Sequence, residues 1–215
     1  MKIDIKLINK IYITSDTHFH QKNICRGVSS WARDSDRIEG NELSTRDFDT
    51  LEAMDKAIVD NINSIVPKDA ILFHLGDWSF GGEEQIFAFR SRLHVQTIHL
   101  ITGNHDHHQE KRSSNSATGK WDFLYSSVQK YLELELGNHK FVLFHYPIKS
   151  WNHVRKGAFH LHGHQHWKGD LKFGNGRMMD VGMDGNDLKP YKLTDVIELL
   201  KDRKFVDEND HHSQK

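Results

Sequence analysis

The sequence contains very little of several features that would assign a chain to a special class of protein. It has a single cysteine, Cys25, which excludes an intramolecular disulfide and favours a reducing compartment. The flanks of Cys25 carry no motif of a nucleophile or metal ligand, so we expect an ordinary packing role. No stretch approaches the ~20 apolar residues that a membrane-spanning helix needs, and residues 1–6 lack the apolar block of a signal peptide. We therefore expect a cytoplasmic protein with no membrane partner.

Excess charge and internal repeats are also absent. The formal net charge is −1, so the chain as a whole is not expected to attract nucleic acid, and such binding would need a local basic patch. The length of 215 residues and the hydrophobic share of 37% are typical of one globular domain. We expect a single domain over residues 1–205, followed by a polar tail over 206–215.

The pattern of apolar residues predicts an α/β fold. The first half alternates strands and helices, and the second half is richer in strands. We expect strands over residues 10–15, 70–75, 97–102, 131–136, 140–145, 158–161 and 177–181. Gly137 and Asn138 are expected to form the turn of a hairpin. Helices are expected over 50–66 and 83–93, and a last helix begins near Thr194 as its N-cap. This order indicates a layered sheet core with helices outside.

What the sequence does have in excess is histidine, with 17 residues. Five of them lie in short polar clusters that directly follow the predicted strands. These clusters are Asp16-Thr17-His18, Asp77, Asn104-His105-Asp106, His145 and His164-Gln165-His166. Because the carboxyl ends of neighbouring strands meet at one edge of an α/β sheet, the five clusters are expected to converge on one pocket.

The residue types and their spacing indicate a metal site. Asp16 and His18 are two residues apart, as are His164 and His166, so an extended backbone turns both members of each pair to one side. A carboxylate such as Asp77 can bridge two cations. Carboxylate, amide and imidazole ligands suit Mn²⁺, Fe²⁺, Ni²⁺, Co²⁺ or Zn²⁺, and the lack of cysteine argues against a structural zinc site.

Taken together, these motifs resemble the calcineurin-like metallophosphoesterase signature. The motifs Asp16-x-His18, Gly76-Asp77, Gly103-Asn104-His105-Asp106, His145 and Gly163-His164-Gln165-His166 occur in the order of that family. Residues 13–20 and 145–147 also resemble a compact microbial and phage branch of it. The resemblance implies an α/β (α+β) fold, a four-layer sandwich of two mixed β-sheets flanked by helices.

The resemblance also implies a role for each motif residue. Asp16, His18, Asp77 and His166 would hold a first divalent metal ion. Asp77, Asn104, His145 and His164 would hold a second, with Mn²⁺ the first expectation and Fe²⁺, Ni²⁺, Co²⁺ or Zn²⁺ the alternatives. A hydroxide bridging the two metals would attack phosphorus in line with the leaving group. His105 would stabilise the transition state or protonate the leaving oxygen, and Asp106 would orient His105.

Several related groups are set aside by the same motifs. Protein Ser/Thr phosphatases have Asp-Arg-Gly soon after the Gly-Asp motif, whereas residues 76–82 contain no arginine. Purple acid phosphatases use a tyrosine ligand, which has no counterpart in the clusters. The metallo-β-lactamase pattern His-x-His-x-Asp-His fails at Lys168, where it needs an aspartate. A phosphatase or phosphodiesterase of another branch is therefore expected.

The substrate is the least defined part of the expectation. The small size of the domain favours a small phosphoester or nucleotide-like substrate. Candidate contacts are His20, Arg26, Trp151 and His162, with Trp31 and the loop cations Lys22, Arg33, Arg37 and Arg46 as weaker ones; an ordinary solvated loop is an equal interpretation. Two other functions stay open: a metal-dependent nuclease acting on DNA or RNA, and a non-catalytic metal-binding scaffold. The oligomeric state cannot be read from the sequence.

Overall fold

The computed structural model describes residues 1–30, 45–113 and 124–206, with the side chains of 111–113 excepted. Trp31, Arg33 and Arg37 of the predicted substrate loop lie outside the described residues, as does nearly all of the predicted tail. Among the described helices, none combines the length and the apolar character that crossing a bilayer would require.

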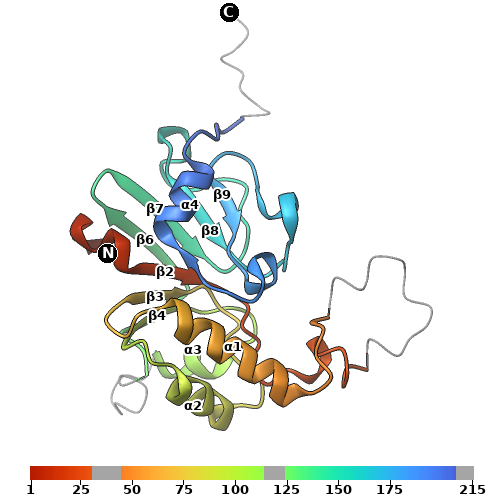
Figure 1. Cartoon of the computed structure of the whole chain (residues 1–215). Helices are drawn as coiled ribbons and strands as arrows, with labels where there is room; N and C mark the ends of the chain where they lie inside the picture. The colour runs from red at the N-terminus through yellow and green to blue at the C-terminus, as the bar shows by residue number, and fades with distance from the viewer. Residues whose placement is uncertain (31–44, 114–123, 207–215) are drawn as a thin grey trace, which may run out of the picture.

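Within these residues, the strands form two mixed five-stranded sheets flanked by helices (Figure 1). One sheet has the order β10-β2-β3-β4-β5, in which β2, β3, β4 and β5 run parallel and β10 runs antiparallel to β2. Its strands are β2 (Ile11–Thr14), β3 (Ile71–His74), β4 (Thr97–Ile101), β5 (Ser127–Gln129) and β10 (Tyr191–Lys192). Parallel strands need crossover connections, and the helices supply them here.

The other sheet has the order β1-β6-β7-β8-β9. The predicted hairpin joins β6 to β7 as an antiparallel pair, and β7, β8 and β9 are parallel. The strands are β1 (Lys2–Ile3), β6 (Tyr131–Leu136), β7 (His139–Phe144), β8 (Phe159–His162) and β9 (Met178–Asp180). This confirms the predicted fold class of two mixed sheets flanked by helices.

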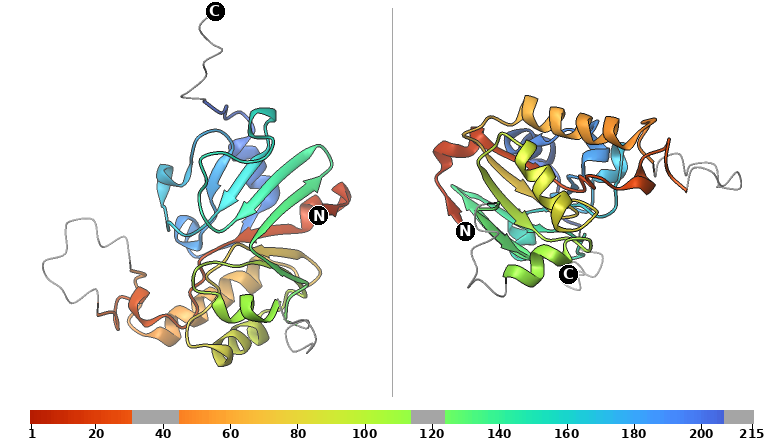
Figure 2. Two further views of the ribbon diagram at one scale, coloured as in Figure 1. Left: turned by 180° about the vertical axis from the view of Figure 1, so that it is seen from behind. Right: turned by 90° about the horizontal axis from the view of Figure 1, so that it is seen from below.

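Four α-helices lie around the sheets in the described parts of the chain: α1 (Leu51–Ile65), α2 (Glu83–Arg92), α3 (His107–Ser113) and α4 (Leu193–Leu200). Figures 1 and 2 show α1, α2 and α3 on the side of β3 and β4, with α4 on the other side of the molecule. The α1 helix begins where Thr50 caps it, the Thr50 hydroxyl accepting from the backbone N–H of Ala53. It ends at Ile65, with Val66 as the C-cap residue directly before Pro67, near the stop that the sequence predicts.

Alternation along the strands divides the interior into two main apolar clusters. Leu72 of β3 faces α1 and packs with Met54 and Ile58, whereas its neighbour Phe73 faces the other sheet and packs with Phe141. This period of two is expected for a strand that is buried on both faces. The cluster between the sheets also includes Val196, Ile197 and Leu200 of α4. The two sheets are thereby held face to face, with their loops meeting at one edge.

Some predicted elements need correction. Helix α4 begins at Leu193 with Lys192 as its N-cap residue, so Thr194 lies inside the first turn and the predicted cap is wrong. Leu193 is buried in the inter-sheet cluster, and this tertiary packing starts the helix earlier than local capping preference would. The apolar pattern does not predict the short strands β1, β5 and β10, because their pairing depends on distant partners, and it does not predict the short helix α3.

Candidate metal centre

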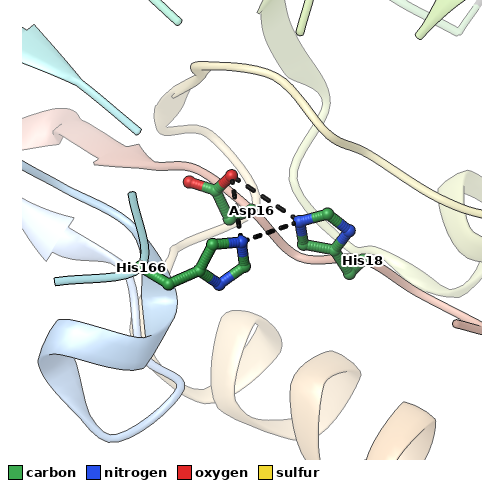
Figure 3. A group of neighbouring side chains, drawn as sticks. All are labelled: Asp16, His18 and His166. Atoms are coloured by element: carbon green, nitrogen blue, oxygen red, sulfur yellow. Dashed lines mark hydrogen bonds and ion pairs between the residues drawn. The ribbon is translucent and has the colours of Figure 1, made fainter. Parts of the chain in front are cut away.

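The first group of predicted ligands gathers at the carboxyl ends of β2 and β8. His18 and His166 point their Nε2 atoms at each other, 3.1 Å apart, and both approach Asp16 Oδ1, at 3.6 and 3.7 Å. Figure 3 shows this triangle, to which segments almost 150 residues apart in sequence contribute. Asp16 is fully buried, and the ring of His166 is partly exposed. Three ligand atoms of suitable type therefore surround one point.

Asp77 lies between this group and a second one. Its Oδ2 is 3.4 Å from Nε2 of His18 and 3.6 Å from Nε2 of His145. Its Oδ1 accepts a hydrogen bond of 3.0 Å from the backbone N–H of His105. Asp16, Asp77 and His145 form a second cluster that could hold a cation. The geometry thus gives Asp77 the central place that a bridging carboxylate requires.

The second group lies at the ends of β4, β7 and β8. Oδ1 of Asn104 is 3.0 Å from Nε2 of His145 and 3.0 Å from Nδ1 of His164. The imidazole of His145 is fully buried, and its Nδ1–H donates 2.7 Å to the carbonyl of Leu75. Because the proton is on Nδ1, the lone pair of the ring is on Nε2, which faces Asp77 and Asn104. All seven predicted ligands therefore meet in one place.

The structure adds two supporting residues that the sequence did not reveal in this role, Asp184 and Arg46. Nδ1–H of His166 donates 2.7 Å to Asp184 Oδ2, so Nε2 is the nitrogen left to face Asp16 and His18. Arg46 binds both oxygens of Asp184 at 3.0 Å and donates to the carbonyls of Thr17 and Asp16 at 2.7 and 2.6 Å. Arg46 thus connects the loop that carries Asp16 and His18 to Asp184, the residue that orients His166. It is buried, so it is not a surface grip for phosphate.

The backbone at the site is unusual. Five of the seven predicted ligands have positive φ, between 45° and 73°, in the left-handed region; they are Asp16, His18, Asp77, His164 and His166. Two glycines permit the close approach of the loops. A Cβ on Gly103 would lie 2.3 Å from Asp77 Oδ1, and one on Gly163 would lie 2.3 Å from Asp16 Oδ2. Neither position accepts a side chain without displacing a predicted ligand.

The electrostatics favour the ligand forms of Asp16 and His18. Burial alone would raise the pKa of Asp16, but the hydrogen bond from His18 and the nearby His166 outweigh it, so the pKa of Asp16 is lowered. Burial lowers the pKa of His18, against the opposing effect of Asp16. An ionised carboxylate beside a neutral imidazole is the combination that binds a divalent cation.

The two predicted catalytic residues differ in their surroundings. The His105 ring is exposed, and its centroid lies 5.7 Å from that of His18 and 4.6 Å from that of Phe80. Asp106 is fully buried beneath the site. Its carboxylate accepts from the backbone N–H groups of Asp77, Trp78 and Gly103 at 2.7, 2.9 and 2.8 Å. These bonds connect the loops after β3 and β4, so Asp106 orients the Asp77 loop; the described bonds of its carboxylate do not reach the ring of His105.

The predicted substrate contacts are more dispersed. His20 is partly exposed and pairs with Asp55, at 3.2 Å from Nδ1 to Oδ2. Arg26 lies at the surface and pairs with Asp47 at 3.1 Å. Trp151 is buried, with its indole N–H bonded to the carbonyl of Ala158 at 3.0 Å, so its faces are occupied by core packing rather than open to a substrate.

His162 is fully buried, and its Nδ1–H donates to the carbonyl of Gly163 at 2.9 Å. Its Nε2 has no hydrogen-bond partner among the described residues. Burial lowers the pKa of His162 to about 3. It is therefore a neutral, buried histidine next to the loop that carries His164. The sequence shows that it is close to this loop but not that it is buried.

The residues present fit a pair of divalent cations. Two overlapping clusters of ligand atoms share Asp16. The outward-facing nitrogens of His145 and His166 are fixed by bonds to Leu75 and Asp184 on the other side of each ring. Oxygen and imidazole nitrogen are donors that Mn²⁺, Fe²⁺ and Zn²⁺ accept.

Comparison with known proteins agrees with the geometry. A model of the calcineurin-like phosphoesterase family matches residues 9–196. An uncharacterized protein of Methanocaldococcus jannaschii, MJ1445, is 25% identical over 207 residues, covering 93% of this chain and 96% of that protein. The crystal structure of AQ665 from Aquifex aeolicus, a protein of unknown function, is similar with a TM-score of 0.58 and 19% identity, covering 88% of this chain and 98% of that one. The last likeness supports the fold alone.

The fold, the family match and the converging ligands together define a metal-dependent phosphoesterase. The chain belongs to the calcineurin-like phosphoesterase family. The resemblance inferred from the five motifs is thereby confirmed.

Proposed function

We propose that the protein hydrolyses a phosphomonoester or phosphodiester of a small or nucleotide-like substrate at a binuclear metal centre. The observation that carries this proposal is the convergence of six carboxylate, amide and imidazole ligands around a seventh, Asp77. His18 and His145 lie on its two sides, each within 3.6 Å of the same carboxylate oxygen.

The ligands would divide as the family resemblance implies, with Asp77 shared. Asp16, His18 and His166 would complete one site, with Asp184 and Arg46 supporting His166 from behind. Asn104, His145 and His164 would complete the other. Two divalent cations held there would polarise the phosphoryl oxygens and lower the pKa of a water molecule toward ~7.

His105 is the protein group proposed to act on the reacting atoms. Its backbone N–H is held by Asp77 Oδ1 at 3.0 Å, which fixes where the residue enters the site. Its ring is exposed and lies beside that of His18, so a substrate phosphoryl group at the ligands would lie near it. The ring can donate a hydrogen bond to a phosphoryl oxygen or a proton to the leaving oxygen.

The test is hydrolysis of bis-p-nitrophenyl phosphate and p-nitrophenyl phosphate, run in parallel with Mn²⁺, with Fe²⁺, Ni²⁺, Co²⁺ or Zn²⁺, and with chelator. We expect turnover that needs metal and falls by roughly 10²-fold or more in His105→Ala. His94→Ala is the matched control, because His94 is an exposed histidine beside α1 and α2 and its loss should leave the rate unchanged. The ratio of diester to monoester hydrolysis would define the preferred ester.

The two other functions are outcomes of the same experiment. Cleavage of single-stranded DNA or RNA at a rate exceeding that of the small esters would favour a nuclease. Stoichiometric binding of two metals without turnover of any ester would favour a scaffold. A folded protein that binds no divalent metal would contradict the proposed metal centre itself.

A further inference from the structure

A pocket of about 300 Å³ opens beside the half of the site that contains Asn104. Its lining includes Gly103 and Asn104, and Asn104 is itself a predicted metal ligand. Phe144 and Tyr146, at the end of β7, form one wall. The remaining lining residues are Thr102, His107, Glu110 and Lys130. A phosphoryl group bound at the ligands would have its organic substituent directed into a space of this kind.

The aromatic wall is continuous with the site. The ring of Tyr146 meets those of His164, His145 and Phe144 edge to face, with centroids 4.7, 4.9 and 5.4 Å apart. These contacts fix the orientation of the tyrosine ring, while the side chain stays partly exposed toward the pocket. A fixed aromatic ring beside a phosphate-binding centre provides a surface on which a flat heterocycle can stack.

Part of the pocket lining is polar, and its charges are paired. Lys130 Nζ lies 2.9 Å from Glu110 Oε2, and the Thr102 hydroxyl donates 3.0 Å to Glu110 Oε1. The carboxylate disfavours a second anionic group beside it, so a polyphosphate or dicarboxylate is a poor occupant. The ammonium and carboxylate can instead bind the donors and acceptors on the edge of an uncharged ring.

The volume also limits the occupant. Pockets for small ligands begin at about 300 Å³, so this one has room for a single nucleoside-sized group but not for several nucleotides of a strand. Resting on the proposed function, we propose that this pocket binds the uncharged nucleoside of a nucleotide substrate, with the base stacked on Tyr146 and its edge near Glu110 and Lys130. Tyr146 would then determine specificity, without taking part in the chemical step.

The experiment measures binding as well as turnover. Adenosine 5′-monophosphate and glycerol 3-phosphate are titrated into the Mn²⁺-loaded protein by calorimetry, because they share the phosphate and differ in the substituent. We expect the nucleotide to bind at least about 10-fold more tightly than glycerol 3-phosphate, since stacking of a base on an aromatic ring is worth at least that much in favourable cases. In Tyr146→Ala this preference should disappear, and in Tyr146→Phe it should be retained.

The control variant is Tyr131→Ala. Tyr131 also contacts Phe144, at 6.2 Å between ring centroids, but does not line the pocket, so its loss should leave the preference intact. The Phe variant also guards against misfolding, since it keeps every ring contact and removes only the hydroxyl.

The outcomes separate the two proposals. Hydrolysis of the p-nitrophenyl esters together with equal affinities for the two ligands, or a preference unchanged in Tyr146→Ala, would overturn the pocket assignment alone. A Tyr146-dependent preference for the nucleotide, without turnover of any ester, would overturn the phosphoesterase proposal and leave a nucleotide-binding site.

Discussion

The two halves of the candidate metal centre are built differently. In one half, His166 is fixed by Asp184, which is in turn fixed by the buried guanidinium of Arg46. In the other half, Asn104 is exposed and His164 is partly exposed, and His145 is held from behind by the carbonyl of Leu75. We therefore expect an anchored half, of high affinity and coupled to folding, and an open half that receives the substrate.

The largest effect should come from removing what the halves share. Asp77→Asn keeps the shape of the side chain but takes a charge from both sites, so we expect metal-dependent hydrolysis to fall on the order of 10³-fold or more. The measurement is kcat for bis-p-nitrophenyl phosphate at saturating Mn²⁺. Asp60→Asn, an exposed carboxylate on α1 paired with Lys56, is the control. Activity retained in Asp77→Asn would contradict the role of Asp77 as a ligand shared by both metals.

Arg46→Met should destabilise the anchored half and, with it, the fold. Removing one partner of a buried ion pair costs about 3–5 kcal/mol in the free energy of unfolding, because the other charge is left without compensation. Urea unfolding in the presence of chelator measures this without metal. The matched control is Lys56→Met, which breaks an exposed ion pair and should cost at most ~1 kcal/mol. Equal losses in the two variants would contradict the proposed anchoring.

Asp184→Asn tests the anchor at the metal itself. The carboxylate orients His166 and raises its basicity, so its loss should weaken one Mn²⁺ site by about 10- to 100-fold and leave the other unchanged. Calorimetric titration of the metal-free protein measures both sites. Asp187→Asn, an exposed carboxylate three residues further along, should bind as the wild type does. Equal weakening of both sites would show that the halves are not independent.

A smaller effect should appear in the pH dependence of the strand that leads into the open half. Burial lowers the pKa of His160 on β8 to about 4, below the value of about 6.5 in an unfolded chain. The native state therefore takes up this proton later than the unfolded state as the pH falls. The stabilising contribution is present above pH ~6.5 and is lost as the pH falls toward 4, by up to about 1.4 kcal/mol per pH unit.

The measurement is the free energy of unfolding of the metal-free protein between pH 7 and pH 5. His160→Gln should be less stable at pH 7 but should lose stability less steeply with acid. A slope identical to that of the wild type would mean that His160 is not neutral in the folded protein.

Much of the site was predictable from sequence, because each ligand follows directly after a strand. The periodic apolar residues of α1 and the runs of β3 and β4 locate the loops that carry Asp77 and Asn104. Asp184 had no such signal, since it is one acidic residue in a turn after β9, and its partner Arg46 is 138 residues away in sequence. A contact between residues so far apart in sequence forms only when the chain folds, and no local sequence pattern predicts it.

The same distinction explains the errors. The charge of Arg46 predicts an exposed loop cation, whereas four hydrogen bonds keep it inside. The position of Trp151 between two ligand motifs predicts a substrate contact, but its ring is buried in a cluster with Ala158. Residue type predicts chemistry well, whereas it predicts depth poorly for side chains that are both long and polar.

The left-handed backbone of five ligands has a consequence for how this protein can change. A non-glycine residue in that conformation is less stable than glycine would be, by about 1 kcal/mol or more at each position. On backbone conformation alone, glycine would be favoured at Asp16, Asp77 and His166, but it would remove the side chains that can bind a cation. The strain of five such residues is therefore concentrated at the candidate metal centre, where it reduces the stability of the fold in exchange for the metal-binding side chains.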